Sequence, residues 1–96
     1  MSEIQKVAKK VLKDESEGIE LLKDFFDDNF SSAIQKILDI KGKVIVTGVG
    51  KSGHIGKKIS ATLSSTGTPS YFVHPTEASH GDMGMVGSED IIFAIS

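Results

Sequence analysis

The sequence predicts an α/β fold in which amino-terminal helices lead into a parallel sheet. Three observations support this class: the spacing of apolar residues changes near residue 42, a β-branched run leads directly into a glycine-rich turn, and strand-like and helix-like stretches then alternate. A chain of 96 residues has room for one small domain. We divide it into an amino-terminal helical segment, residues 1–42, and an α/β segment, residues 43–96.

The helical segment carries apolar residues at steps of three and four positions, which is the spacing of an amphipathic helix. We expect two helices, over about residues 3–28 and 31–40, with Gly18 as a candidate bend in the first. The candidate caps of the second helix are Asn29, Ser31 and Ser32. The apolar positions are Ile4, Val7, Val11, Leu12, Ile19, Leu22, Phe25, Phe26, Ala33, Ile34, Ile37 and Leu38.

The α/β segment contains three strand-like runs, at residues 43–48, 70–74 and 90–96, and one clear helix at 52–66. Right-handed crossovers between such elements give a parallel sheet. Residues 75–84 are expected to form a loop or a single helical turn. The helix residues expected to face the sheet are Ile55, Ile59, Ala61 or Thr62, and Leu63. Parallel sheets are normally covered on both faces, and no helix follows the third strand, so we expect a sheet truncated there and the front part of a longer domain.

Composition narrows the classes of partner. The formal net charge is −2 with both signs mixed along the chain, which disfavours nucleic acid and membrane partners. The chain contains no cysteine, which excludes disulfides and thiol catalysis. Its first thirty residues are charged and amphipathic, so no secretory signal is expected. No apolar run approaches the roughly 20 residues of a membrane span, so a cytoplasmic protein is expected. Every basic residue other than histidine is lysine, so an anion site must use backbone N–H groups, hydroxyls and lysine.

The stretch VIVTGVGKSGHIGKK, residues 44–58, has the composition of a phosphate-binding turn between a strand and a helix. A triphosphate loop would need a glycine where Ile45 stands. The spacing of Gly48, Gly50 and Gly53 matches the dinucleotide fingerprint. That function also needs an acid at the end of the second strand, and the chain has a histidine and a proline there.

A compact phosphate ester is the third and favoured interpretation of this turn. Glycines such as Gly50 let backbone N–H groups approach the anion, while Lys51 adds a positive charge and Ser52 a hydroxyl. A tight turn that binds nothing remains the alternative, although such a turn requires neither the lysine nor the serine.

The segment HPTEASHGD gathers two histidines and two acids at the carboxyl edge of the predicted sheet, where open α/β sheets bind ligands. His80 suits proton transfer near neutral pH. His74, His80 and Asp82 are also credible zinc ligands, and the alternative is that both histidines merely cap turns. His54, in the first helical turn, is expected to face solvent or another subunit.

Together, the motifs G-x-GKSG, STGTPS and HPxEAxHGD closely resemble the amino-terminal part of the D-arabinose-5-phosphate isomerases, in the sugar isomerase (SIS) domain family. The resemblance runs from about Lys41 to Ser96. It implies a doubly wound, five-stranded parallel sheet between helices. It also implies reversible isomerisation of D-ribulose 5-phosphate to D-arabinose 5-phosphate, which supplies 3-deoxy-octulosonate for lipopolysaccharide or capsule.

The resemblance assigns roles to individual residues. It implies that Lys51 is the catalytic lysine and that His80 contacts substrate and can act as acid or base. His74 takes the place of a zinc-binding histidine, and Gly67 and Thr68 take those of substrate-contacting residues. It implies a homotetramer with sites at subunit boundaries, a sugar phosphate substrate and no required cofactor.

Two further expectations concern activity. The family's serine-rich phosphate loop, later glutamates and histidine, and CBS regulatory domains are not found in these 96 residues, so little activity is expected from this chain alone. The rival function is a non-catalytic SIS module that senses a phosphosugar. A sensor could dispense with His80, so the intact HPxEAxHGD run favours the enzyme.

Overall fold

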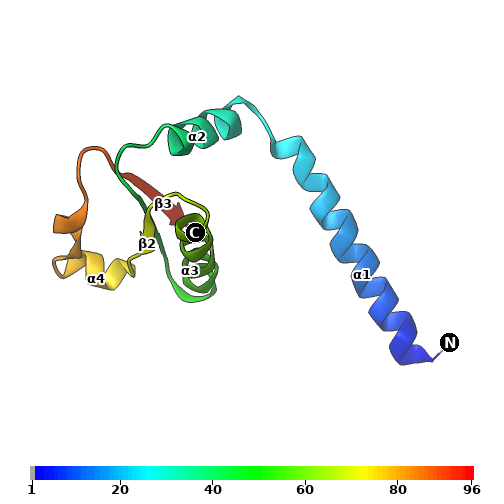
Figure 1. Ribbon diagram of the computed structural model, residues 1–96. Coiled ribbons are helices and arrows are strands. Elements are labelled where there is room, and N and C mark those ends of the chain that lie inside the picture. Colours follow the sequence, from blue (N-terminus) through cyan, green and yellow to red (C-terminus); the bar gives the residue numbers. More distant parts are fainter. Residues whose placement is uncertain (1) are drawn as a thin grey trace. The chain divides into compact units, whose positions relative to one another are not determined.

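The computed structural model describes residues 2–96, except for the side chain of Asp82 (Figure 1). The chain separates into two compact units, one up to Gln35 and one from Lys36. We describe each unit by itself.

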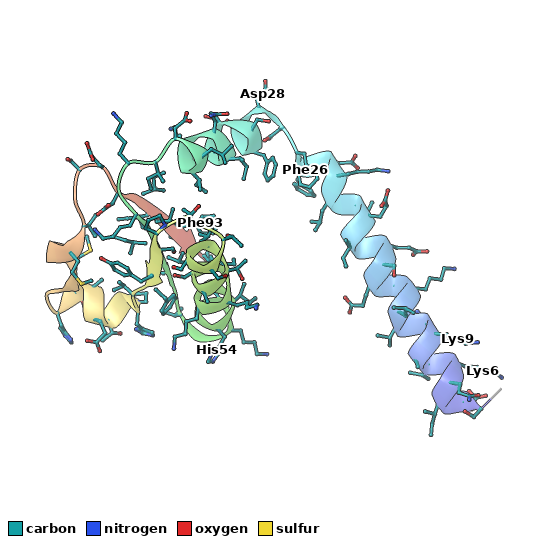
Figure 2. All side chains as sticks on the ribbon, viewed as in Figure 1. Lys6, Lys9, Phe26, Asp28, His54 and Phe93 are labelled. Atoms are coloured by element: carbon teal, nitrogen blue, oxygen red, sulfur yellow. The ribbon has the colours of Figure 1, made fainter. Side chains whose placement is uncertain are left out.

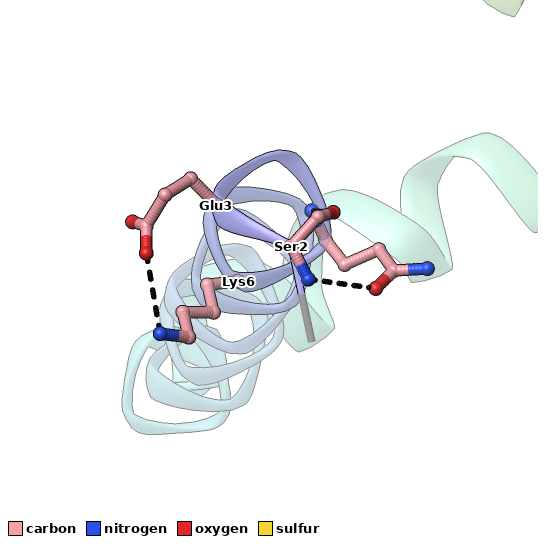
Figure 3. Close-up of polar contacts among 4 residues, drawn as sticks. Ser2, Glu3 and Lys6 are labelled. Carbon is pink, nitrogen blue, oxygen red and sulfur yellow. Dashed lines mark hydrogen bonds and ion pairs between the residues drawn. The ribbon is translucent and has the colours of Figure 1, made fainter.

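The amino-terminal unit begins with helix α1, Glu3–Leu21. Ser2 caps it: the Ser2 hydroxyl accepts from the Gln5 N–H at 3.2 Å, and the Gln5 side chain accepts from the Ser2 N–H at 3.1 Å (Figure 3). A short 3₁₀ helix, η1, continues over Leu22–Phe25. The predicted helix over 3–28 is therefore interrupted after Leu21, and Gly18 lies inside α1 without breaking it. A single glycine lowers helix propensity but keeps its backbone hydrogen bonds, so it need not end a helix.

Helix α2, Asp28–Leu38, begins three residues before the predicted start. The Asp27 carboxylate accepts a hydrogen bond from the Phe30 N–H at 2.9 Å, as a helix cap does. The predicted caps at 29, 31 and 32 are therefore wrong, because those residues lie within the helix. Several residues in this stretch are of types that cap helices, and Asp27, which precedes the predicted caps, is the one that caps α2.

The carboxy-terminal unit contains a three-stranded, fully parallel sheet, as the sequence predicts. Its strands are β1 (Val44–Gly48), β2 (Ser70–Phe72) and β3 (Ile91–Ile95), in the order β2-β1-β3. The central strand is the most buried, and the side chains of Val44 and Val46 are completely enclosed. The β-branched run at 44–46 therefore forms the core of this unit.

Helix α3, Gly50–Ser65, packs against the sheet through small residues (Figure 1). Its buried positions are Gly53, Gly56 and Ser60. An added Cβ at Gly56 would lie 3.1 Å from atoms of Val46 and Phe72, so the sheet supplies the bulky side chains and the helix supplies the space.

This packing corrects the predicted contact face of α3. Ile55 is 57% exposed, and Ala61 and Thr62 are exposed as well. Ile59 and Leu63 are half-buried, so only these two of the predicted residues approach the sheet. Apolar periodicity pointed to the largest side chains, whereas close helix–strand approach selects the smallest ones.

Beyond β2 the chain forms a short helix, α4 (Pro75–Ser79), and a 3₁₀ turn, η2 (Asp82–Met85). The segment predicted as a loop or single turn thus contains two short helical turns. An apolar cavity of about 40 Å³ lies between this segment and the sheet. The hydroxyl of Thr47 in its wall is buried and has no hydrogen-bond partner among the described residues.

An ion pair joins the amino ends of β1 and β3. Lys43 Nζ lies 2.7 Å from Asp90 Oδ2, and the Asp90 carboxylate also accepts from the backbone N–H groups of Lys43 at 2.8 Å and Gly87 at 2.6 Å. The Asp90 side chain is only 4% exposed. The hydrogen bond from the Lys43 ammonium and those from the two N–H groups lower the pKa of Asp90 to about 2, and the same pair raises the pKa of Lys43.

Candidate functional site

The turn between β1 and α3 presents free backbone donors. Gly50 has φ +56°, a conformation that favours glycine, and it opens the helix directly after Val49. The first intrahelical bond of the turn runs from the Gly53 N–H to the Val49 carbonyl at 3.1 Å. The N–H groups of residues 50–52 precede that bond and point out of the helix end, where an anion is favoured.

Gly53 fixes this turn against the end of β1. An added Cβ at residue 53 would lie 2.7 Å from the carbonyl oxygen of Gly48, which is closer than Cβ atoms come in proteins. Strand end and helix start therefore touch through their backbones, and only glycine leaves room for that contact. Two glycines of the motif thus have distinct tasks: Gly50 supplies a backbone angle and Gly53 supplies space.

A hollow of about 190 Å³ opens beside this helix start. It is lined by Gly50, Gly53, His54, Lys57, Phe72 and His74. The charged or chargeable side chains among these residues are all basic, and none is acidic. The Lys57 ammonium lies over the Phe72 ring, 5.5 Å from its centre. The hollow therefore combines helix-end N–H groups with basic side chains, a combination suited to a phosphate ester.

His74 connects β2 to this hollow and caps α4. Its Nδ1 accepts a hydrogen bond from the Thr76 N–H at 3.1 Å. In the neutral ring the proton is then on Nε2, so the free edge of His74 is a hydrogen-bond donor. A metal ligand would need the opposite tautomer, with Nδ1 donating and Nε2 free to bind the ion. As placed, His74 is arranged to donate to an anionic or hydroxyl group.

Three predicted site residues, Lys51, Ser52 and His80, lie at the same sheet edge but outside the lining of the hollow. Lys51 and Ser52 follow Gly50 in the first turn of α3, with Lys51 exposed and Ser52 half-buried. His80 ends α4, its N–H donating to the Glu77 carbonyl at 3.0 Å, and it is exposed. The structure therefore places Gly50 and His74 in one hollow. Lys51 and His80 are exposed at the same edge of the sheet, outside the lining of that hollow.

Gly67 and Thr68 lie at the opposite edge, between the end of α3 and the start of β2. Gly67 has φ +103°, and the Thr68 N–H donates to the Leu63 carbonyl at 2.9 Å. Within one chain they are thus placed at the amino ends of the strands, as their position in the sequence indicates.

The predicted zinc ligands include Asp82, whose side chain is outside the described part of the chain. Among the side chains that are described, no three His, Asp or Glu groups converge as a metal site would require.

The residues that sequence reasoning missed are His54, Lys57 and Phe72. His54 was expected to face solvent or another subunit; it is exposed, and it also lines the hollow, which the sequence did not indicate. Figure 2 shows it at the start of α3. A usable pattern existed, because residues 50, 53, 54 and 57 follow at helical steps of three and four from the glycine turn.

A parallel sheet whose first strand–helix turn faces a basic hollow is the arrangement that α/β domains use to hold anionic ligands. A family model described as SIS domain matches residues 36–96. The chain belongs to the SIS domain family.

Known relatives agree with this assignment. The chain is 53% identical over 94 residues to an arabinose 5-phosphate isomerase, KdsD, of Yersinia pestis, covering 98% of this chain and 29% of that protein. A solved structure, that of Escherichia coli CFT073 c3406 in complex with arabinose 5-phosphate, superposes with a TM-score of 0.87 and 42% identity, over the whole chain and 52% of that structure. A candidate sugar-phosphate isomerase of Listeria monocytogenes gives a TM-score of 0.88 at 28% identity, with the same two coverages of 100% and 52%.

The chain spans less than a third of the length of the curated isomerases that it matches. Among its described residues, no helix combines the length and apolar character needed to cross a membrane.

Proposed function

We propose that this chain supplies the phosphosugar-binding region of an aldose–ketose isomerase that interconverts D-ribulose 5-phosphate and D-arabinose 5-phosphate. One observation carries the proposal: the basic hollow at the start of α3, lined by Gly50, His54, Lys57 and His74. The isomerase relatives supply the class of substrate. The hollow supplies the reason that a phosphate would be held there.

The binding step uses groups that keep their charge or polarity at neutral pH. The N–H groups of residues 50–52 and the Ser52 hydroxyl bind phosphate oxygens, and the nearby ammonium groups neutralise the remaining charge. His74 donates from Nε2 to a phosphate or sugar oxygen. In a chain without arginine, several weaker donors replace one bidentate guanidinium.

The chemical step needs a base that carries one proton between C1 and C2 of the sugar and a second group that moves another proton between their oxygens. The proposal assigns only the second transfer to this chain. Lys51 stabilises the enediolate that forms between these transfers, and His80 moves the proton between the oxygens. Both side chains are exposed at the edge where the sugar would extend from the hollow. Gly67 and Thr68 at the far edge would reach the same sugar only from a neighbouring copy, so the proposal includes a homo-oligomer, a tetramer in the family.

The proposal also covers the cofactor requirement, the cellular location and the partners of the protein. The isomerase requires neither an organic cofactor nor a metal. Zinc binds His74 only when the imidazole gives up the hydrogen bond from the Thr76 N–H and frees a ring nitrogen for the ion. The protein works in the cytoplasm on a small sugar phosphate that leads to lipopolysaccharide or capsule precursors, without nucleic acid or membrane partners.

A phosphosugar sensor is the second candidate. The specific observation in its favour is that the hollow gathers binding-type groups without Lys51 or His80 in its lining. A sensor would bind the same ester at the same turn and turn nothing over.

Isomerisation of arabinose 5-phosphate, measured in the longest natural polypeptide that contains this chain, separates the two functions. Lys51→Ala and His80→Ala should each lower kcat by roughly 100-fold or more, as expected for loss of a group acting on the transition state. Lys58→Ala is the matched control, since Lys58 is an exposed lysine of α3 outside the hollow. Full turnover in both variants would reject the assigned roles, and tight binding without turnover in the parent would establish the sensor.

A further inference from the structure

The ring of Phe72 forms one wall of the basic hollow, and the backbone of α3 fixes it there. Phe72 lies beside Val46 of the central strand and faces the helix. Added Cβ atoms at Gly53 and Gly56 would lie 3.5 Å and 3.1 Å from atoms of the ring, so one edge of the ring rests against these two glycines. The ring therefore has little freedom to turn away from the hollow that it lines.

Lys57, one position after Gly56 on α3, places its ammonium over this ring. Its Nζ atom lies 5.5 Å from the ring centre. The face of an aromatic ring is electronegative and attracts a cation at such a distance. A lysine side chain in water samples many rotamers, and the contact with the ring reduces their number. The ammonium is thus held at the hollow, although the Lys57 side chain as a whole is exposed.

A second lysine–aromatic contact in the same unit shows what distinguishes Lys57. Lys43 Nζ lies 5.7 Å from the ring centre of Tyr71, the neighbour of Phe72 in β2. Asp90, at 2.7 Å, balances the charge of Lys43. Lys57 forms no ion pair with any described carboxylate, and no acid lines its hollow. Within the described part of the chain its charge has no counterion, and an anionic ligand would supply one.

We propose that Phe72 is a positioning residue for phosphate binding, because its ring holds the Lys57 ammonium where the phosphate of the ligand binds. The inference rests on the proposed function, and it explains how an exposed lysine contributes to the site. An ammonium that is already held at the hollow loses less conformational freedom on binding than a mobile one does. Phe72 therefore acts on the phosphate through Lys57 and makes no polar contact of its own.

Calorimetric titration of the longest natural polypeptide that contains this chain, with arabinose 5-phosphate as the ligand, tests this role. Phe72→Leu keeps an apolar side chain but has no ring to hold the ammonium. It should weaken binding roughly two- to fivefold, from the usual strength of a cation–π contact. Tyr71→Leu is the matched control, because it removes the ring beside Lys43, whose ammonium Asp90 also holds. The control should bind the sugar phosphate as the wild type does.

A double-mutant cycle separates positioning through Lys57 from a general loss of structure. Lys57→Ala should weaken binding, and adding Phe72→Leu to it should weaken binding no further, because the ring then has no ammonium to hold. A structural effect of Phe72→Leu would persist without Lys57, and the two losses would multiply. Lys57→Arg should keep most of the wild-type affinity, since a guanidinium also stacks on an aromatic face, and should lose it when combined with Phe72→Leu.

Inorganic phosphate, as a second ligand, shows on which part of the sugar phosphate the ring acts. Phe72→Leu should weaken its binding by the same factor, because Lys57 meets the phosphate group. An effect on the sugar phosphate alone would mean that the ring contacts the sugar directly, and the proposal would be wrong. Losses that multiply in the double variant, or a Phe72→Leu variant with wild-type affinity, would also overturn it. A wild type that binds neither ligand would reject the proposed function, and this role of Phe72 with it.

Discussion

Gly53→Ala tests whether close backbone contact holds the candidate binding turn. The new Cβ would lie 2.7 Å from the Gly48 carbonyl oxygen, well inside the 3.4 Å at which ordinary contact begins. The obstructing atom belongs to the backbone at the end of the central strand, so it cannot rotate away as a side chain can. Either β1 or the start of α3 must therefore move.

The magnitude follows from two opposing effects. Alanine in a helix is ordinarily better than glycine by about 0.5–1 kcal/mol. Overpacking a buried contact costs about 1–3 kcal/mol. We expect a net loss of about 1–2 kcal/mol in the free energy of unfolding. The overpacking cost exceeds the gain in helix propensity because the new Cβ would lie 2.7 Å from a backbone oxygen, which cannot rotate away. With a urea m-value near 1 kcal/mol/M for a small unit, the midpoint should fall by roughly 1–2 M.

Urea unfolding followed by circular dichroism measures this loss, with Gly18→Ala as the matched control. Gly18 is also a helical glycine, but an added Cβ there meets nothing within 4 Å. Its replacement should therefore increase helix content and leave the sheet unit unchanged. If Gly53→Ala were as stable as the wild type, or more stable, the contact between strand end and helix start would not be what requires glycine.

Three other predictions address separate parts of the chain. The folded state lowers the pKa of Asp90 to about 2, so the ionised carboxylate stabilises the wild type above pH 4 and this stabilisation is lost as the pH falls through about 2. Asp90→Asn should remove that pH-dependent stabilisation, whereas a Glu89→Gln control should keep it. Acid unfolding measures the difference, and identical curves for Asp90→Asn and the wild type would contradict it. Lys57→Ala should weaken binding of arabinose 5-phosphate roughly three- to tenfold, in a salt-dependent way, by calorimetry; equal affinity would remove Lys57 from the site. Asp27→Ala should destabilise α2 by about 0.5–2 kcal/mol and reduce helicity, through loss of the cap to Phe30; unchanged helicity would show that another group caps α2.

Much of the fold could be predicted because it depends on local patterns. The β-branched run, the glycine turn and Pro69 fixed the order of strand, helix and strand, and the parallel sheet follows from that order. The end of the first helix and the cap at Asp27 were missed, because several residues there have equal propensity for either role.

The contact face of α3 could not be predicted from periodicity. Its buried positions are small because Phe72 and Val46, distant in sequence, fill the interface from the other side. The lining of the hollow was missed for a related reason. Lys57 and Phe72 reach it only after β2 has paired with β1, and no local pattern marks that pairing.

The candidate site divides in a similar way. The turn at Gly50 and the position of His74 were evident from the motifs, and the structure brings both into one hollow. The roles of Lys51 and His80 remain predictions, since each is exposed and neither is part of the lining.

The central claim is that the N–H groups at the start of α3 and the imidazole of His74 hold the phosphate of a sugar phosphate. Titration of the ¹⁵N-labelled protein with arabinose 5-phosphate, followed by amide and imidazole chemical shifts, tests it most directly. We expect saturable shifts at Gly50, Lys51, Ser52 and His74, with inorganic phosphate competing for the same amides. Shifts confined to Gly67 and Thr68, or none at millimolar sugar phosphate, would contradict the claim.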